Sequence, residues 1–375
     1  MEVLGVKEER IKVGLLFGGP SQEHEVSLMS ANAIWTALDN NKYDKISIGI
    51  TRDGVWYLAD HPEKWMTRGF PENPSEIAER VRIDPGSEGG FVAGPQGEPV
   101  NLDVVFPVLH GPFGEDGTVQ GLLELCGTAY VGSGVASSAV AMDKQIMKEI
   151  FLHHSLPVVG YEVFYREDLS RKIDQIINAV SEELGFPCFV KPANLGSSVG
   201  ISKVNNAEQL PAALRSAAVH GRKIIVEEGL LNVRELECSV LGNREVYVAG
   251  PGEIIPAGEF YDYRSKYHDH DTELKMNVAL PGKIVDRMRR LAVRAFQAVK
   301  GCGMARIDFF YIEEEQEIIV NEINTIPGFT AVSMYPRLWT SQGMQFSELV
   351  DRLIRLAIKR YELEHSWRNL LVNNE

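Results

Sequence analysis

Alternating apolar and polar positions near the C-terminal end of the chain predict two paired strands. Residues 304–311 and 318–324 are each rich in Ile, Phe, Tyr or Val, and the acidic stretch 313–315 between them is typical of a turn. Side chains two positions apart lie on the same face of a strand. The pattern therefore predicts a hairpin that gathers selected polar side chains on one face.

Four polar side chains converge if these strands pair. Arg306 and Asp308 share a face of the first strand, and Glu322 and Asn324 share a face of the second. Carboxylate and amide oxygens are ligands that Mg²⁺ prefers, and a Mg²⁺ with few protein ligands completes its shell with water and phosphates. A solvated strand face is the alternative, and the Pro-Gly pair at 327–328 disfavours it because it exposes backbone N–H groups nearby. We therefore expect a nucleotide site here.

The first part of the chain has the pattern of an open α/β sheet. Residues 11–17 are a buried strand, and the Gly-rich turn 18–21 leads into a helix. The apolar positions of this helix keep helical spacing at Val26, Met29, Ala33, Ile34 and Ala37. Strands at 45–51 and 103–110 continue the sheet.

Ligands of such a sheet bind outside the carboxyl ends of its strands. Glu23, in the first turn of the helix, and His110, at a strand end, are therefore expected to face one crevice. The turn at 18–21 lacks the third glycine of a dinucleotide fingerprint and is weak evidence by itself. The loop 110–117 adds three glycines around two acids, which favours a binding role over a purely structural histidine.

The middle of the chain contains a strand, loop, strand unit after two helical patterns. The strand 186–191 is followed by the Gly- and Ser-rich loop 192–200 and by a second strand at 201–204. Backbone N–H groups of such a loop, together with the Ser197 and Ser198 hydroxyls, can face phosphates. The segment is therefore expected to be a phosphate-covering flap.

This loop is not a Walker A loop, because no Gly-Lys-Ser/Thr closes it. The cation for the phosphates has to come from another position. Lys191, at the end of the preceding strand, and Lys144, at the start of an earlier helix, are the candidates. A solvent-facing surface position is the alternative for either lysine.

Acidic strand ends and one aperiodic loop complete the pattern. The strand 223–228 ends in two acids, and a later strand carries Glu235. Such acids can accept hydrogen bonds from an adenine amino group or a ribose hydroxyl, or they can be surface charges. The segment 258–271 is polar and aromatic without period, which predicts a lid that excludes water. Further helices are expected at 283–300 and 346–361, and the last dozen residues are expected to fray.

Composition limits the class of protein. The 375 residues predict two or three domains at about 150 residues each. The net charge of −14 disfavours nucleic acid or an anionic membrane as a general partner. The four cysteines stand singly in apolar runs and are expected to be reduced core thiols. The chain shows no signal peptide and no apolar run of about 18 residues, so a cytoplasmic location is expected.

Five motifs follow one another along the chain. They are G-G-P-S-Q-E-H-E-V-S, H-G-P-F-G-E-D-G, K-P-A-N-L-G-S-S-V-G, Y-R-S-K-Y, and A-R-I-D with N-E-I-N-T-I-P-G-F-T. In this order they resemble the ATP-grasp superfamily and, within it, the D-alanine–D-alanine ligase family.

The resemblance runs from about residue 12 to residue 363 and implies an α/β fold with a three-domain ATP-grasp architecture. It implies an N-terminal open parallel sheet domain at 11–140. A central ATP-grasp domain with the flap is expected at 141–250, and a C-terminal one with the lid and metal site at 251–375. ATP would then be held between two sheets.

The resemblance also implies the reaction, which is the ATP-dependent ligation of two D-alanine molecules for peptidoglycan precursor synthesis. The first carboxylate takes the γ-phosphoryl group, and the second amine attacks the acylphosphate. By the same likeness, Glu23 holds the first ammonium, His110 lies near the substrates and Ser333 meets the second carboxylate. Arg306 and the Gly328 N–H would stabilise the tetrahedral oxyanion.

The nucleotide contacts implied by the resemblance involve most of the remaining candidates. Lys144 and Lys191 hold the α and β phosphates, Lys266 holds the γ phosphate, and the flap residues Ser197 and Ser198 cap them. Glu227 and Glu235 meet the adenosine. Two Mg²⁺ ions, for which Mn²⁺ can substitute, are bound by Asp308, Glu322 and Asn324.

The implied partners are ATP and D-alanine, with no nucleic acid and no membrane, and a homodimer is left open. A ligase that joins D-alanine to D-serine or D-lactate is the main alternative. Tyr267 argues against it, since a lid tyrosine bonded to Ser197, and through it to Glu23, can order the groups around an amine acceptor. A nucleotide-binding module without turnover is a second alternative. It would lack a metal ligand or Arg306, and neither the metal ligands nor Arg306 is missing from the sequence.

Overall fold

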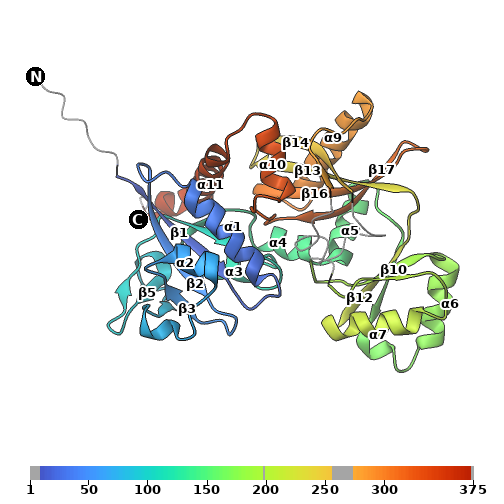
Figure 1. The fold of residues 1–375 in the computed structure, drawn as a ribbon, viewed down its shortest axis with the longest axis horizontal. Coiled ribbons are helices and arrows are strands. Elements are labelled where there is room, and N and C mark those ends of the chain that lie inside the picture. Colours follow the sequence, from blue (N-terminus) through green and yellow to red (C-terminus); the bar gives the residue numbers. More distant parts are fainter. Residues whose placement is uncertain (1–8, 197–198, 256–272, 373–375) are drawn as a thin grey trace, which may run out of the picture.

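The structure is a computed structural model that describes residues 9–196, 199–255 and 273–372. Within these residues the strands form four sheets. Figure 1 shows the blue N-terminal part at one end and a green and yellow lobe, residues 160–228, at the other. The orange and red C-terminal part lies between them. The predicted mixed α/β fold is confirmed.

The N-terminal sheet is built from the apolar runs of the first part of the chain. Its strands are β1 (Ile11–Gly18), β2 (Tyr43–Ile50), β3 (Trp56–Leu58), β7 (Val104–Val108) and β8 (Ala129–Tyr130), and the nearby helices are α1 (His24–Ala37), α2 (Pro62–Arg68), α3 (Thr118–Leu125) and α4 (Val135–Met142). The order is β3-β2-β1-β7-β8, with β3 alone antiparallel to its neighbour. The expected open sheet is therefore confirmed, although Met29 of α1 is 46% exposed and lies outside the apolar face.

A small antiparallel sheet covers one edge of this part. It consists of β4 (Val81–Ile83), β5 (Phe91–Ala93) and β6 (Glu98–Pro99). Phe91 and Val81 are buried in the same core as Leu16 of β1. The hydrophobic pattern did not predict this sheet, because strands of two or three residues are too short to show a period.

The central lobe is one antiparallel sheet with two helices. Its elements are β9 (Tyr161–Tyr165), α6 (Ile173–Glu183), β10 (Cys188–Pro192), β11 (Ser202–Val204), α7 (Leu210–His220) and β12 (Lys223–Glu228). The order is β11-β10-β12-β9, and Val180 and Leu214 of the helices are fully buried in its core. The predicted strand, loop, strand unit is confirmed by the antiparallel pairing of β10 with β11.

The C-terminal sheet contains the hairpin predicted from the sequence. Its elements are β13 (Val233–Gly242), β14 (Val246–Ile255), β15 (Glu273–Lys275), α9 (Gly282–Ala298), β16 (Gly303–Ile312), β17 (Glu317–Asn324), α10 (Met334–Ser341) and α11 (Phe346–Val372). The order is β15-β14-β13-β16-β17, all antiparallel. The three domain ranges stay predictions, and this sheet joins strands from both sides of the boundary placed at residue 250.

The hydrophobic cores connect parts that are distant in sequence. Leu353 of α11 and Leu338 of α10 share one core with Val13 of β1, so the C-terminal helices pack on the N-terminal sheet. The helix α5 (Lys144–His153) has Met147 and Phe151 in the core of the C-terminal sheet. Elements from both ends of the chain thus surround the region where the candidate residues lie.

Two sequence expectations need correction. The last helix does not end near residue 361 but continues to Val372, so most of the final dozen residues are helical rather than frayed. Pairs at i,i+4 spacing such as Glu348 with Arg352 support a helix despite its polar composition. Cys302 is only partly buried, whereas Cys126, Cys188 and Cys238 are buried as expected.

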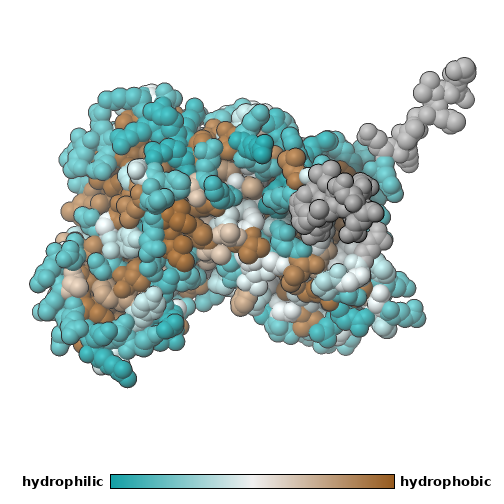
Figure 2. Space-filling model, turned by 180° about the vertical axis from the view of Figure 1, so that it is seen from behind, coloured by the Kyte–Doolittle hydropathy of each residue, from teal (hydrophilic) through white to brown (hydrophobic). Residues whose placement is uncertain are grey.

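The surface seen from behind is mostly polar at its rim, with apolar residues gathered toward the middle (Figure 2). Within the described parts of the chain, none of the helices combines the length and the apolar character needed to cross a bilayer.

Candidate active site

The pairing of β16 with β17 brings the four predicted polar residues together. Arg306 is directly opposite Asn324, and Asp308 is directly opposite Glu322. Arg306 donates from Nε and Nη2 to the two carboxylate oxygens of Asp308, each over 2.7 Å, and Asn324 Nδ2 donates to Asp308 Oδ2 over 3.1 Å. Such two-point pairing fixes the plane of the guanidinium as well as its position.

Arg306 has a second carboxylate partner on the neighbouring strand. Glu237 of β13 is paired across from Asp308, and its Oε1 lies 3.1 Å from Arg306 Nε. Burial alone would lower the pKa of the Arg306 guanidinium, but the Asp308 and Glu237 charges hold it well above its usual range. The guanidinium is therefore a fixed positive charge inside the site.

The donor set at this hairpin fits a hard divalent cation. Asp308 and Glu322 supply carboxylate oxygens, and the Asn324 amide supplies a third oxygen. Among the described residues no group of three His, Cys, Asp or Glu side chains could hold a metal ion, so a site here depends on that amide. Lys144 Nζ lies 3.2 Å from Glu322 Oε2, so a cation that binds Glu322 competes with this ion pair.

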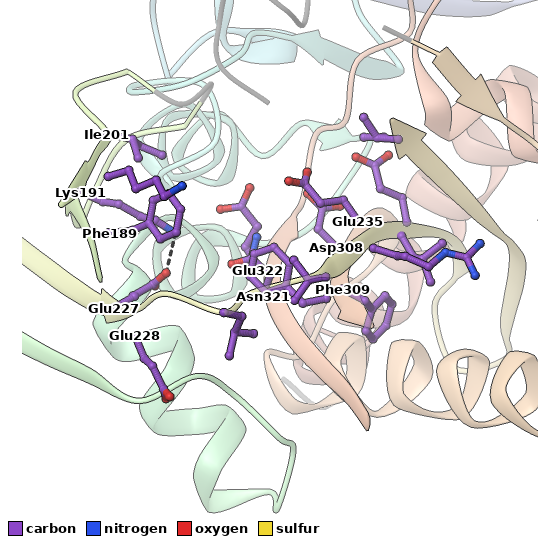
Figure 3. A pocket seen from close by; sticks show the side chains of 18 of the residues that line it. Phe189, Lys191, Ile201, Glu227, Glu228, Glu235, Asp308, Phe309, Asn321 and Glu322 are labelled. Atoms are coloured by element: carbon purple, nitrogen blue, oxygen red, sulfur yellow. Dashed lines mark hydrogen bonds and ion pairs between the residues drawn. The ribbon is translucent and has the colours of Figure 1, made fainter. Parts of the chain in front are cut away.

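A cavity of about 740 Å³ opens between the central sheet and the C-terminal sheet. Figure 3 shows Lys191 and Glu227 from one side of this cavity facing Glu322 and Asp308 from the other. Lys144 and Glu235 also line it. A space of this size can hold a nucleotide, since ligand pockets generally span about 300–1,000 Å³.

Glu227 is held by two lysines. Its Oε2 lies 2.5 Å from Lys191 Nζ, and its Oε1 lies 3.1 Å from Lys148 Nζ. Burial works to raise the pKa of Glu227, but the two lysine charges outweigh it and bring the pKa down to about 2. The contact with adenosine stays a prediction for Glu227 and for Glu235.

A second, smaller cavity contains the residues predicted to meet the amino-acid substrates. Glu23, His110, Arg306, Gly328 and Ser333 all line it. They come from the two ends of the chain and converge because the C-terminal helices pack on the N-terminal sheet. Their individual roles stay predictions.

His110 is buried and connects two parts of the structure. Its Nδ1 lies 3.1 Å from the Ile326 carbonyl oxygen, and its Nε2 lies 3.3 Å from Ser30 Oγ. Burial lowers the pKa of this imidazole, so it is neutral at pH 7. The ring lines the cavity and is oriented by protein groups on both nitrogens.

The turn after β17 presents backbone groups beside this cavity. Gly328 leaves no room for a side chain, because a Cβ there would lie 2.7 Å from Ser333 Oγ. Ser333 Oγ accepts from the Thr330 N–H over 3.0 Å, which fixes the serine next to the turn. Gly328 and Arg306 both line this smaller cavity.

Four predicted residues lie outside the described part of the chain. They are Ser197 and Ser198 of the flap and Lys266 and Tyr267 of the lid.

Three acidic or basic residues of the site were not assigned a role from the sequence. Lys148 is completely buried against Glu227. The only feature of the sequence that could have pointed to it is its spacing of one helical turn from Lys144. Glu237 lines both cavities. Glu115 accepts from the Gly111 N–H over 3.0 Å, and burial together with the Glu23 charge holds its pKa well above the usual range. The contacts of Lys148 and Glu237 depend on the tertiary structure and have no local pattern, whereas the Glu115 contact joins residues four apart in one loop.

Two family models match most of the chain. Residues 12–133 match the model described as D-ala D-ala ligase N-terminus, and residues 150–355 match D-ala D-ala ligase C-terminus. The D-alanine–D-alanine ligase of Halothermothrix orenii is 44% identical over 354 residues, covering 93% of this chain and 99% of the relative. The D-alanine–D-alanine ligase of Heliobacterium modesticaldum is 46% identical over 352 residues, covering 93% of this chain and 95% of the relative.

Solved structures agree with these matches. The VanG D-Ala:D-Ser ligase from Enterococcus faecalis superposes with a TM-score of 0.84 at 36% identity and covers 93% of this chain and 100% of its own. The D-alanine–D-alanine ligase from Coxiella burnetii has a TM-score of 0.84 at 34% identity and covers 98% and 99%. The chain therefore belongs to the D-alanine–D-alanine ligase family and has the ATP-grasp fold.

Proposed function

We propose that this protein is an ATP-dependent carbon–nitrogen ligase that joins two D-alanine molecules into D-alanyl-D-alanine, a peptidoglycan precursor, and releases ADP and phosphate. One observation carries the proposal most strongly. In a chain of this family, Arg306 and Asp308 form a two-point pair between a nucleotide-sized cavity and a smaller cavity lined by Glu23 and Gly328.

ATP binds between the central and C-terminal sheets in this proposal. Lys144 and Lys191 line that cavity and hold the α and β phosphates. Lys266 and the flap serines 197–198 hold and cap the phosphates at the γ end, and Glu227 and Glu235 lie toward the adenosine. Two Mg²⁺ ions, or Mn²⁺ in their place, held by Asp308, Glu322 and Asn324 would neutralise the charge of the transferring phosphoryl group.

The first step makes an acylphosphate. Glu23 holds the ammonium of the first D-alanine, so that its carboxylate points toward the γ phosphate. A carboxylate oxygen attacks that phosphorus, and ADP leaves. His110 lies beside the substrates without adding charge, because burial lowers the pKa of its imidazole. Its two ring nitrogens are oriented by protein partners.

The second step forms the amide bond. The free amine of the second D-alanine, whose carboxylate meets Ser333, attacks the acyl carbon. The resulting oxyanion is stabilised by the Arg306 guanidinium and the Gly328 N–H, which are fixed before the reaction begins. The C–O bond to phosphate then breaks, and the departing phosphate carries away the oxygen that came from the first carboxylate and takes up the proton that the attacking nitrogen loses.

D-serine and D-lactate are the alternative acceptors. A D-Ala:D-Ser ligase is 36% identical to this chain, which makes D-serine an alternative acceptor. Relatives named D-alanine–D-alanine ligase are more similar, at 44–46% identity. Tyr267 would favour an amine acceptor if, as expected from the sequence, it bonds through Ser197 to Glu23. We therefore assign D-alanine.

We also assign the protein to the cytoplasm, where ATP is available.

We further propose that the protein is a homodimer. Leu125 of α3 is 74% exposed, and Val135 of the adjacent helix α4 is 41% exposed. A contiguous apolar patch marks an interaction surface, and these two side chains are our candidates for one. Sedimentation velocity of the wild type should give twice the chain mass, and Leu125→Glu should give one chain mass. A monomeric wild type would exclude the dimer.

The test of the activity is phosphate release from ATP with a panel of D- and L-amino acids and D-hydroxy acids, with the dipeptide product identified by mass. We expect turnover with D-alanine alone and the mass of D-alanyl-D-alanine. Asp308→Asn is the matched inactive control. Release with D-alanine only when D-serine or D-lactate is also present would replace the acceptor assignment, and release with no D-amino acid would refute the ligase.

A further inference from the structure

Lys148 is a completely buried lysine that the proposed chemistry does not use. It lies on α5, one helical turn after Lys144, and its side chain is 0% exposed. Lysine is almost never fully buried unless it is paired, because removing its charge from water costs several kcal/mol. Its partner is Glu227, whose Oε1 lies 3.1 Å from Lys148 Nζ.

The same carboxylate also binds a lysine that faces the cavity. Lys191 Nζ lies 2.5 Å from Glu227 Oε2. Two ammonium groups therefore share one carboxylate, and the three side chains together carry one surplus positive charge. Lys191 and Glu227 line the larger cavity, whereas Lys148 is not among the described residues that do.

The charges explain why the buried lysine matters. Without Lys148, Lys191 and Glu227 would be a neutral pair at the cavity wall, with little net attraction for a polyphosphate. With Lys148 present, its charge compensates the Glu227 carboxylate from the interior of the protein. The positive charge of Lys191 then remains at the cavity wall, in a low-dielectric environment. Burial lowers the pKa of Lys148, and the Glu227 charge opposes that shift.

Helix α5 places this lysine through its other contacts. Met147 and Phe151 anchor the helix in the core of the C-terminal sheet, while Lys148 reaches the central sheet. Lys144, one turn earlier, pairs with Glu322 of β17 over 3.2 Å. One helix therefore connects the two walls of the cavity through two lysines.

We propose that Lys148 is a positioning residue for the nucleotide, which compensates Glu227 so that the charge of Lys191 remains available to the nucleotide phosphates. The proposal rests on the proposed function, which assigns Lys191 to the α and β phosphates. It predicts a specific loss of phosphate recognition when the Lys148 charge is removed.

The test compares ADP with adenosine, in the presence of Mg²⁺, by equilibrium binding to the full-length protein. Lys148→Met should weaken ADP binding by about tenfold and leave adenosine binding unchanged, because adenosine has no phosphate. Lys172→Met is the control, since it removes a lysine that pairs with Asp168 at the surface over 3.0 Å. We expect both affinities to be those of the wild type in this variant.

A rescue separates charge compensation from a structural role. The double variant Lys148→Met/Glu227→Gln removes one positive and one negative charge and leaves Lys191 with its surplus charge. The ratio of ADP to adenosine affinity should return to within about twofold of the wild type, since any loss at the adenosine contact of Glu227 affects both ligands equally, and Lys148→Arg should retain that ratio. If Lys148→Met does not fold, these two variants decide, and a lowered ratio in the double variant overturns the proposal.

The remaining outcomes are also decisive. Unchanged ADP binding in Lys148→Met, or an equal loss for ADP and adenosine, overturns the proposal. Lys191→Met tests the underlying assignment separately. If Lys191→Met weakens ADP binding but Lys148→Met does not, only this inference fails; if Lys191→Met has no effect, the assignment of Lys191 to the phosphates fails with it.

Discussion

Asp308 of the hairpin and Glu227 of the central sheet face the same cavity but are held in different ways. The partners of Asp308, Arg306 and Asn324, come from its own hairpin, two and sixteen residues away in sequence. Glu227 is held by lysines from a neighbouring strand and from a helix. The Asp308 side chain is 14% exposed and that of Glu227 is 3% exposed.

This difference separates two uses of a carboxylate. Asp308 is open enough to exchange part of its pairing with Arg306 for a metal ion, which would leave the guanidinium available to an oxyanion. Glu227 has buried cations on both oxygens, and leaving either lysine unpaired would cost free energy. Asp308 should therefore govern turnover, and Glu227 should govern stability and charge.

The largest effect is expected from Asp308→Ala. Turnover should fall by about 10³-fold or more, the scale for losing a group that stabilises transition-state charge, while the fold persists because no core volume is lost. Phosphate release at saturating Mg²⁺ measures the turnover, and a thermal melt followed by circular dichroism measures whether the fold persists. A rate equal to the wild type would remove Asp308 from the metal site.

Glu227→Ala should show the opposite behaviour. It leaves Lys148 and Lys191 buried without their carboxylate, which should cost about 3 kcal/mol of unfolding free energy. Urea denaturation of this variant and of Asp308→Ala makes the comparison directly. If Asp308→Ala is the less stable of the two, the distinction between them is wrong.

Arg306→Lys should lower turnover by about 10²-fold, the scale for losing one oxyanion donor. Lysine keeps the charge but cannot make the two-point contact with Asp308 while also facing the substrate. Steady-state kinetics should show the loss in kcat rather than in KM for ATP. A kcat near that of the wild type would count against the oxyanion role.

The pH dependence of stability gives the smallest effect. The pKa of Glu227 is about 2 when folded and near 4.5 when unfolded, so its contribution is present above pH 4.5 and is lost as the pH falls toward 2. The stability difference between wild type and Glu227→Gln should be constant from pH 7 to 5 and should shrink below pH 4.5. A difference that grows on acidification would contradict this assignment.

The sequence predicted the hairpin well because its information is local. Period 2 placed Arg306 with Asp308 and Glu322 with Asn324, and strand pairing then brought the two sets together. The same reasoning could not find Lys148, since nothing in a helical pattern says that a lysine will meet a carboxylate from a distant strand. It could not find the sheet β4–β6 either, because its strands are too short to show a period.

Local sequence patterns did not predict that Glu23 and His110 lie close to the hairpin and the turn after it. A sheet-edge rule placed those two residues together, but their approach to Gly328 and Ser333 depends on α10 and α11 packing on the N-terminal sheet. That packing uses long-range apolar contacts, which have no motif. The resemblance to a family supplied the link that local patterns could not.

The ligation through an acylphosphate is tested most directly by oxygen transfer. D-alanine labelled with ¹⁸O in its carboxylate is supplied with ATP and Mg²⁺, and the phosphate released is examined by mass spectrometry. The account predicts one ¹⁸O atom in each phosphate formed, in step with D-alanyl-D-alanine. Phosphate without ¹⁸O, formed together with the dipeptide, would show that the carboxylate never attacks the γ phosphate and would contradict the mechanism.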